Sequence, residues 1–413
     1  MGGFGAARLA VTAALLAVVW RATGWLEGIG GPIQVLEAAL AGWEPSPAQA
    51  FCAEEPGAPV PVVLPALEVV DADLHPNDPF QVPRRGSLGL SLMSWVPNAY
   101  FRSLSVGMLS FSRAQLVGLN GQRDFRHIME PFDGKTIEQA MRESGHNVTG
   151  WVAAESSYVL APRGQEANPS VHVLETKWLA AQAPAVIASA GGEEMIDTRR
   201  EEYFSFLARQ PAVRAVHWAA SFAPKAPFVA SAAKNENPAF HLRRMSSIAE
   251  ILPGKVVEVS VFHPQLGLVA GFARRNPNTT VVVGRAGGPL LCGRPLLECI
   301  EYTDGLASVA RERNVFLKIS AIGSPSSGLA YHPDTPPSEA VLAGDWEPLI
   351  HFVIEHFGPE RVLFGTNAPF DLPVVSVRSF WNLAKSAVSR LNVSDEAKGR
   401  LLAGNARGVY GLL

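Results

Sequence analysis

The sequence predicts an α/β protein built on a single (β/α)8 TIM barrel, because strand-like and helix-like segments alternate eight times along it. Short apolar or β-branched runs are separated mostly by stretches with apolar residues at i, i+3 and i+4. No glycine-rich phosphate loop follows an early strand, which argues against a doubly wound open sheet. At 413 residues and 47% hydrophobic residues, the chain can form a barrel of about 250 residues plus further segments.

The barrel should span residues 67–412. Strands are expected at residues 67–71, 147–153, 184–189, 213–218, 256–262, 279–284, 314–320 and 361–365. Helices are expected at residues 136–144, 171–182, 199–209, 239–252, 265–275, 296–313 and 346–357. Ser394, which two acidic residues follow, should cap a last helix that reaches Tyr410.

An N-terminal hydrophobic segment precedes the barrel. Residues 9–20 carry no charge and lie between Arg8 and Arg21. This length fits a signal or membrane-anchor segment, which is assigned to residues 1–29. The protein is therefore predicted to be secretory or membrane-associated, with residues 9–20 as the part that could contact a membrane. A buried helix in a cytoplasmic protein is the alternative. The proline-rich residues 30–66 are expected to form a linker.

A long insertion separates the first two strands, at residues 76–135. Loops of this length are normally functional or separately packed. Because the insertion follows a barrel strand, it should rise from the face where barrels place their chemistry. It is interpreted either as a lid over a site or as an insertion packed on the rim.

Composition excludes some classes of partner and site. The formal net charge is −3 and no basic stripe stands out, which argues against nucleic-acid binding. The three cysteines are Cys52, Cys292 and Cys299, and no Cys-x-x-Cys motif is present, so a zinc–thiolate site is not expected. Cys292 and Cys299 could form a disulfide, or both could be free thiols.

Polar residues gather at the ends of the predicted strands. Asp73 and His75 are two residues apart after the first strand, so their side chains should point the same way. Five later strands also carry or end in charged, histidine or amide side chains. Because a closed parallel barrel brings the ends of its strands to one face, these side chains should lie near one another. These residues are His217, His263, Arg285, Lys318, Asn367 and Asp371. Lys318 could instead be an ion-pair partner inside the barrel.

Several of these motifs are similar to those of a known family. Asp71-Ala-Asp73-Leu-His75, His263-Pro-Gln-Leu, Gly284-Arg285-Ala-Gly-Gly-Pro289 and Asn367-Ala-Pro-Phe-Asp371 occur in the order and spacing of that family. Over residues 68–412 the chain resembles the amidohydrolase-related (amidohydrolase 2) family, in its branch of TIM-barrel lactonases and metal-dependent hydrolases. The resemblance implies a (β/α)8 fold and hydrolysis of a lactone, amide or other carboxyl-derived bond.

The chain departs from the family at four site positions. Asp73 and Arg285 replace histidines, and His217 falls where the family often has Gly-Ile-Arg. Asn367 stands where the wider superfamily has an acid, although the Asn-x-Pro-x-Asp form is familiar in this branch. Zinc takes three or four protein ligands, and Arg285 adds a positive charge where a ligand was expected. No tightly bound metal is therefore expected. If a divalent metal such as zinc is present, Asp73 and His75 would hold it.

Two functions remain open. In the first, a metal-independent hydrolase acts on a small carboxylated molecule. Its substrate contacts would be Arg285, Asn367 and His263, with Arg285 as the carboxylate clamp. His75 or His217 would polarise the carbonyl or move a proton, and Asp73 or Asp371 would be the general base. In the second, the site has decayed and the barrel is a binding or scaffold protein.

Overall fold

The structure is a computed structural model. It describes residues 61–412, apart from residues 79–80, 83–130, 157–167, 194, 196, 224–234, 325–326, 330 and 332–334. All described residues belong to one compact unit, Phe51–Leu413. The predicted targeting segment, nearly all of the linker and most of the insertion lie outside the described residues. Within them, no helix has the length and apolar character needed to cross a membrane.

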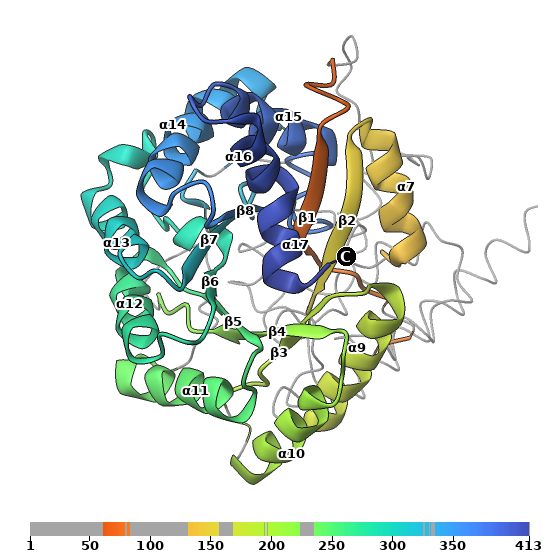
Figure 1. Cartoon of the computed structure of the whole chain (residues 1–413), viewed down its shortest axis with the longest axis vertical. Coiled ribbons are helices and arrows are strands. Elements are labelled where there is room, and N and C mark those ends of the chain that lie inside the picture. The colour runs from red at the N-terminus through yellow and green to blue at the C-terminus, as the bar shows by residue number, and fades with distance from the viewer. Residues whose placement is uncertain are drawn as a thin grey trace, which may run out of the picture. The chain divides into compact units, whose positions relative to one another are not determined.

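Eight parallel strands form one sheet in chain order, with helices around it (Figure 1). The strands are β1 Glu68–Leu74, β2 Asn147–Ala154, β3 Val186–Ser189, β4 Val213–Ala219, β5 Val256–Ser260, β6 Val281–Val283, β7 Val315–Ile319 and β8 Val362–Phe364. The (β/α)8 barrel is confirmed, with each strand inside or close to its predicted range. Only β1 runs clearly further than predicted, because Leu74 still pairs with Ala153 of β2.

Contacts just beyond β8 close the barrel onto β1. Asn367 N donates to Asp73 O at 2.8 Å, and His75 N donates to Ala368 O at 2.8 Å. The Thr366 hydroxyl donates to Asp71 Oδ2 at 2.7 Å. A Cβ on Gly365 would lie 2.4 Å from Asp73 Cβ, so the close approach of these two segments requires glycine at that position.

Helices cover the outside of the strands. The longer ones are α7 Gly134–Ser144, α9 Pro169–Gln182, α10 Asp197–Ala208, α11 Pro238–Ile251, α12 Leu266–Arg275, α13 Ile300–Ala310, α14 Glu339–Phe357 and α15 Val377–Ser389. The chain ends with α16 Asp395–Gly399, a π-helical turn Arg400–Gly404 and α17 Asn405–Tyr410. The Ser394 side chain accepts from Ala397 N, as the predicted cap requires. α15 was not predicted, although Trp381, Ala384 and Val388 on it are buried.

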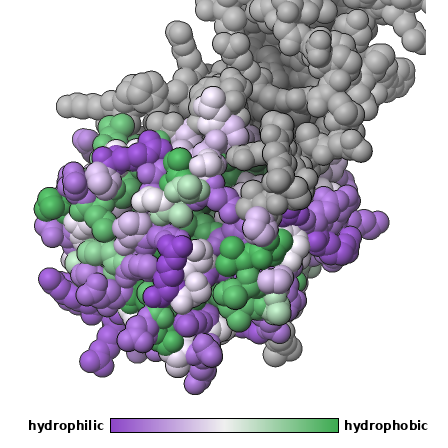
Figure 2. Space-filling model, turned by 90° about the horizontal axis from the view of Figure 1, so that it is seen from above, coloured by the Kyte–Doolittle hydropathy of each residue, from purple (hydrophilic) through white to green (hydrophobic). Residues whose placement is uncertain are grey.

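The apolar core lies between the strands and the helices. Valines of nearly every strand are buried there with aromatic residues such as Phe204, Phe272 and Trp346. On the face shown in Figure 2, hydrophilic and hydrophobic residues are intermixed over the described part of the chain. Since the buried core is mainly apolar, the polar residues inside the barrel are exceptions in it. Buried polar groups need hydrogen-bond or ion-pair partners.

Candidate active site

A buried lysine lies at the centre of the polar residues inside the barrel. Lys318 of β7 is 0% exposed. Its Nζ donates to Asp73 Oδ1 at 3.0 Å, to Ala72 O at 3.1 Å and to Glu258 Oε1 at 2.5 Å. The hydroxyl of Tyr410, from α17, donates to the other Glu258 oxygen at 2.8 Å. Lys318 is thus an ion-pair partner inside the barrel and joins carboxylates from β1 and β5.

The buried ion pairs hold the charged forms of their members. Burial alone would lower the pKa of Lys318, but Asp73 and Glu258 raise it above its usual value. Burial would raise the pKa of Asp73, but Lys318 and then His75 bring that pKa well below its usual range. Asp73 is therefore an ionised partner of Lys318, and a carboxylate with so low a pKa is a weak general base.

A second hydrogen-bonded chain joins the ends of three strands. His217 of β4 lies with Nδ1 2.8 Å from Glu155 Oε1, just after β2, and with Nε2 2.8 Å from the hydroxyl of Ser260 at the end of β5. If the neutral ring donates from Nδ1, its Nε2 accepts from Ser260. A hydroxyl, an imidazole and a carboxylate in this order form the arrangement that activates a nucleophile.

His75 connects this chain to the buried ion pairs. Its Nδ1 donates to the backbone oxygen of Glu155 at 2.8 Å, and its Nε2 lies 3.6 Å from Asp73 Oδ1. Within the described residues, Nε2 is buried without a hydrogen-bond partner. Burial lowers the pKa of His75, Asp73 opposes that change and Arg285 adds to it, so the ring is biased toward its neutral form.

Asp371 is a buried carboxyl group whose pKa is shifted in the opposite direction from that of Asp73. Its Oδ1 accepts from Asn367 Nδ2 at 2.7 Å, and its Oδ2 accepts from Gly323 N at 2.8 Å. Burial raises the pKa of Asp371 to about 7, although these hydrogen bonds and Arg285 oppose the rise. A carboxyl group with this pKa exchanges a proton near neutral pH, which suits a general base.

Arg285 and His263 follow neighbouring strands but lie in different surroundings. Arg285 begins a turn in which four consecutive residues have positive φ, from Arg285 (54°) to Gly288 (60°). Its charge influences the pKa values of both His75 and Asp371. His263 instead lies with Nδ1 4.0 Å from Cys292 Sγ and Nε2 3.7 Å from Glu301 Oε2.

The structure therefore links most of the predicted site residues. Asp73, His75 and His217 belong to one continuous set of contacts through Glu155, and Asn367 joins it through its backbone bond to Asp73. Glu155 and Ser260 were not predicted, although both directly end or follow strands. The prediction that the site lies under residues 76–135 concerns an insertion most of which lies outside the described residues.

The residues at the mouth do not fit a tightly bound zinc ion. Asp73 Oδ1 and His75 Nε2 could supply two ligands, but the ammonium of Lys318 already binds the same Asp73 oxygen. Zinc usually takes at least three protein ligands. In the described part of the chain, His263, Cys292 and Cys299 are the only three His, Cys, Asp or Glu side chains whose ligand atoms lie close together, and none of them belongs to this network.

Comparison with known proteins identifies relatives of this chain. The model of the amidohydrolase family matches residues 201–412. A crystal structure of an amidohydrolase from Burkholderia multivorans with bound HEPES has a TM-score of 0.55 at 17% identity, covering 84% of this chain and 99% of that one. A second structure of an amidohydrolase from that organism, with bound zinc, has a TM-score of 0.55 at 18% identity and the same coverage. No curated protein matches.

Proposed function

Because this chain belongs to the amidohydrolase family, we propose that it hydrolyses a lactone, amide or other carboxyl-derived bond of a small carboxylated molecule. We further propose that it does so without a tightly bound metal at the barrel mouth. The observation that supports this proposal best is the Glu155–His217–Ser260 chain, with 2.8 Å contacts on both sides of the imidazole. This arrangement can activate a hydroxyl without a metal.

In this mechanism Ser260 is the nucleophile and His217 is the proton-transfer group. Ser260 Oγ attacks the carbonyl carbon while His217 Nε2 takes the hydroxyl proton, and Glu155 stabilises the imidazolium. The carbon–oxygen or carbon–nitrogen bond then breaks, and His217 returns the proton to the leaving group. Water attacks the resulting serine ester while Asp371 or His217 takes one of its protons. The bond from the acyl carbon to Ser260 Oγ then breaks and the proton passes to Ser260 Oγ, which releases the acid and restores the hydroxyl.

Arg285 is proposed to bind the carboxylate of the substrate. Arg285→Ala should raise KM about 10- to 100-fold with little change in kcat, since a charge-assisted hydrogen bond contributes about 1.5–3 kcal/mol to binding. Steady-state kinetics on an ester with and without a free carboxylate will measure this. Arg275→Ala, at the exposed end of α12, is the matched control. An equal loss of activity on both esters would contradict the clamp.

The pKa of Asp371 predicts a pH dependence. That pKa is raised to about 7 in the folded protein, so the carboxyl group loses its proton as the pH rises through about 7. If ionised Asp371 is a general base, kcat should rise with pH through this range and reach a plateau above it. The pH profile of Asp371→Asn should be lower and flatter. A wild-type profile that stays flat between about pH 5 and 9 would contradict this role.

Two other functions must be separated from this one. The zinc-bound structure from Burkholderia multivorans favours a metal-dependent hydrolase, and the replaced family residues favour a decayed barrel that only binds its ligand. A panel of lactones, esters and amides should be tested with disulfide-intact protein, with and without a chelator. The proposal predicts turnover that survives chelation and less than one zinc per chain by elemental analysis. Loss of turnover on chelation would favour the metal-dependent hydrolase. No turnover on any substrate would favour the decayed barrel.

A further inference from the structure

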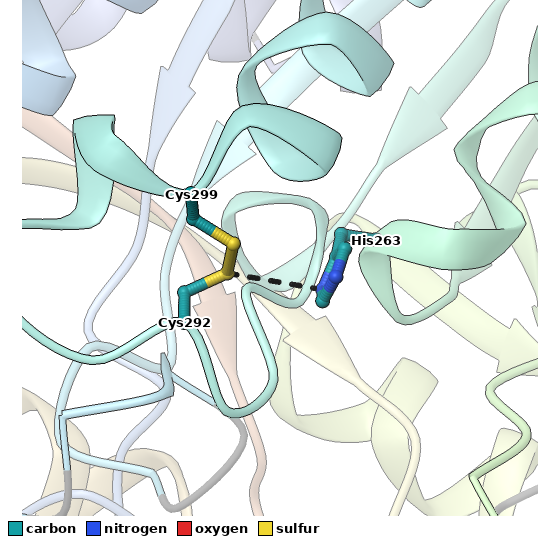
Figure 3. A group of neighbouring side chains, drawn as sticks. All are labelled: His263, Cys292 and Cys299. Carbon is teal, nitrogen blue, oxygen red and sulfur yellow. Dashed lines mark hydrogen bonds between the residues drawn. A yellow bond between two sulfur atoms is a disulfide. The ribbon is translucent and has the colours of Figure 1, made fainter.

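We propose that the protein has a redox-gated zinc site formed by Cys292, Cys299 and His263 when the disulfide between the two cysteines is reduced. None of these three residues belongs to the Lys318 ion pairs or to the Glu155–His217–Ser260 chain. The disulfide joins the loop after β6 to the residue before α13, and the ring of His263, after β5, faces it (Figure 3). One ring nitrogen of His263 and the two sulfur atoms all lie within 4.8 Å of one another. This inference does not depend on the proposed hydrolase function.

In the oxidised form the two sulfurs are bonded to each other and cannot act as thiolate ligands. A dithiol reductant would transfer two electrons and two protons, opening the S–S bond to two thiols while the reductant becomes its own disulfide. Zinc then displaces the two thiol protons and binds both thiolates and the imidazole. Cys292 and Cys299 are both partly exposed, so a reductant can reach the bond.

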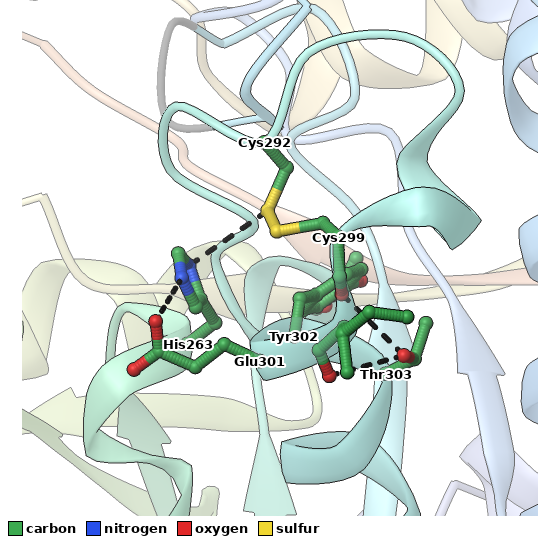
Figure 4. Close-up of a disulfide and its surroundings, with 8 residues drawn as sticks. His263, Cys292, Cys299, Glu301, Tyr302 and Thr303 are labelled. Carbon is green, nitrogen blue, oxygen red and sulfur yellow. Dashed lines mark hydrogen bonds and ion pairs between the residues drawn. A yellow bond between two sulfur atoms is a disulfide. The ribbon is translucent and has the colours of Figure 1, made fainter.

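The histidine is oriented as zinc-binding histidines usually are. His263 Nδ1 faces Cys292 Sγ at 4.0 Å, while Nε2 faces Glu301 Oε2 at 3.7 Å (Figure 4). A carboxylate at one ring nitrogen favours the proton there and leaves the lone pair of the other for a metal. The ring also packs edge-on against Tyr302, with ring centroids 6.1 Å apart. Glu301 is therefore proposed as the positioning residue for His263.

The backbone holds the three ligands in place independently of the disulfide. His263 N donates to Gly288 O at 2.8 Å, and Cys292 N donates to Pro289 O at 3.2 Å. Cys299 O accepts from two amides of α13, each at 3.0 Å. The Cα atoms of the two cysteines are 5.4 Å apart, so both thiolates can still reach one ion at the usual zinc–sulfur distance of about 2.3 Å.

The ligand set selects a borderline-soft metal. Two thiolates and one imidazole suit zinc and leave a fourth position for water, whereas Mg²⁺ and Ca²⁺ prefer oxygen ligands. The absence of a Cys-x-x-Cys motif from the sequence argued against any zinc–thiolate site. Here the two cysteines are seven positions apart in the sequence, and a histidine from another barrel segment completes the set of ligands.

The test measures metal binding to the full chain in its two redox states. Metal-free Cys52→Ala protein, which lacks the remaining cysteine, is titrated with Zn²⁺ in competition with a chromogenic chelator, with the disulfide intact or after reduction by a phosphine. We expect one tightly bound zinc only in the reduced form, with release of protons. Co²⁺ in place of zinc should give a thiolate-to-cobalt charge-transfer band. No such band after reduction, or equal zinc binding in both states, would overturn the proposal.

Substitutions separate this site from adventitious binding to two thiols. Glu301→Gln should weaken zinc binding by about 10-fold. Losing a carboxylate that holds a zinc-binding histidine usually costs about 10–100-fold in affinity, and the low end is expected here because the Glu301 side chain is exposed. His263→Ala should weaken zinc binding further. Glu298→Gln, in the short turn just before α13, is the matched control for Glu301 in the first turn of that helix. Unchanged affinity in His263→Ala would overturn the proposal. If the variants are insoluble, the Co²⁺ spectrum of the reduced parent protein decides.

Discussion

Lys318→Met is expected to lower the free energy of unfolding by about 3–5 kcal/mol, the usual cost of removing one partner from a buried ion pair. The side chain of Lys318 is fully buried and is bonded to both Asp73 and Glu258. Methionine fills much of the same volume, so the loss comes from two carboxylates left in the barrel interior without their cation. Urea unfolding followed by circular dichroism will measure the change.

Two control variants isolate this electrostatic cause. Adding Asp73→Asn and Glu258→Gln to Lys318→Met should recover part of the lost stability, because no unpaired charge then remains in the interior. Lys398→Met removes an ion pair with the fully exposed Asp395 on α16 and should change stability by less than about 1 kcal/mol. If Lys318→Met costs no more than Lys398→Met, the buried ion pairs do not support the barrel.

The fold could be predicted because it depends on local patterns. Buried parallel strands give short apolar runs, and the covering helices give a different period, so the alternation is visible along the chain. The end of β1 was predicted too early because Asp71 and Asp73 look like the start of a loop. In the structure their polar side chains are bonded to Thr366 and Lys318, far along the chain, and no local pattern shows such partners.

The sequence could predict which strand ends carry the site residues, but not the chemical role of each residue. Asp73 and Asp371 looked equally suited to be the general base. Lys318, from β7, keeps the pKa of Asp73 low, whereas burial raises the pKa of Asp371 to about 7. Ser260 was overlooked because an isolated serine at a strand end is common. Its hydrogen bond to His217, which distinguishes it, exists only after β4 and β5 pair.

His217→Ala should lower kcat about 10²–10⁴-fold on any substrate that the protein turns over, because proton transfer by a positioned side chain contributes this much. His217 contacts both Glu155 and Ser260 at 2.8 Å, so its removal breaks the proposed proton path at its centre. KM should change less than kcat. His351→Ala, which removes a histidine bonded to a backbone oxygen of α15, is the matched control and should retain activity.

Ser260→Ala distinguishes a serine nucleophile from a water nucleophile. If Ser260 attacks the substrate, its loss should be as severe as that of His217, and the double variant should be no worse than either single variant, because the residues act as a unit. A slow ester substrate should then leave an acyl group on Ser260, detectable by mass spectrometry of the intact protein. If Ser260→Ala retains most of its activity while His217→Ala does not, His217 activates water directly, and the serine only orients the imidazole.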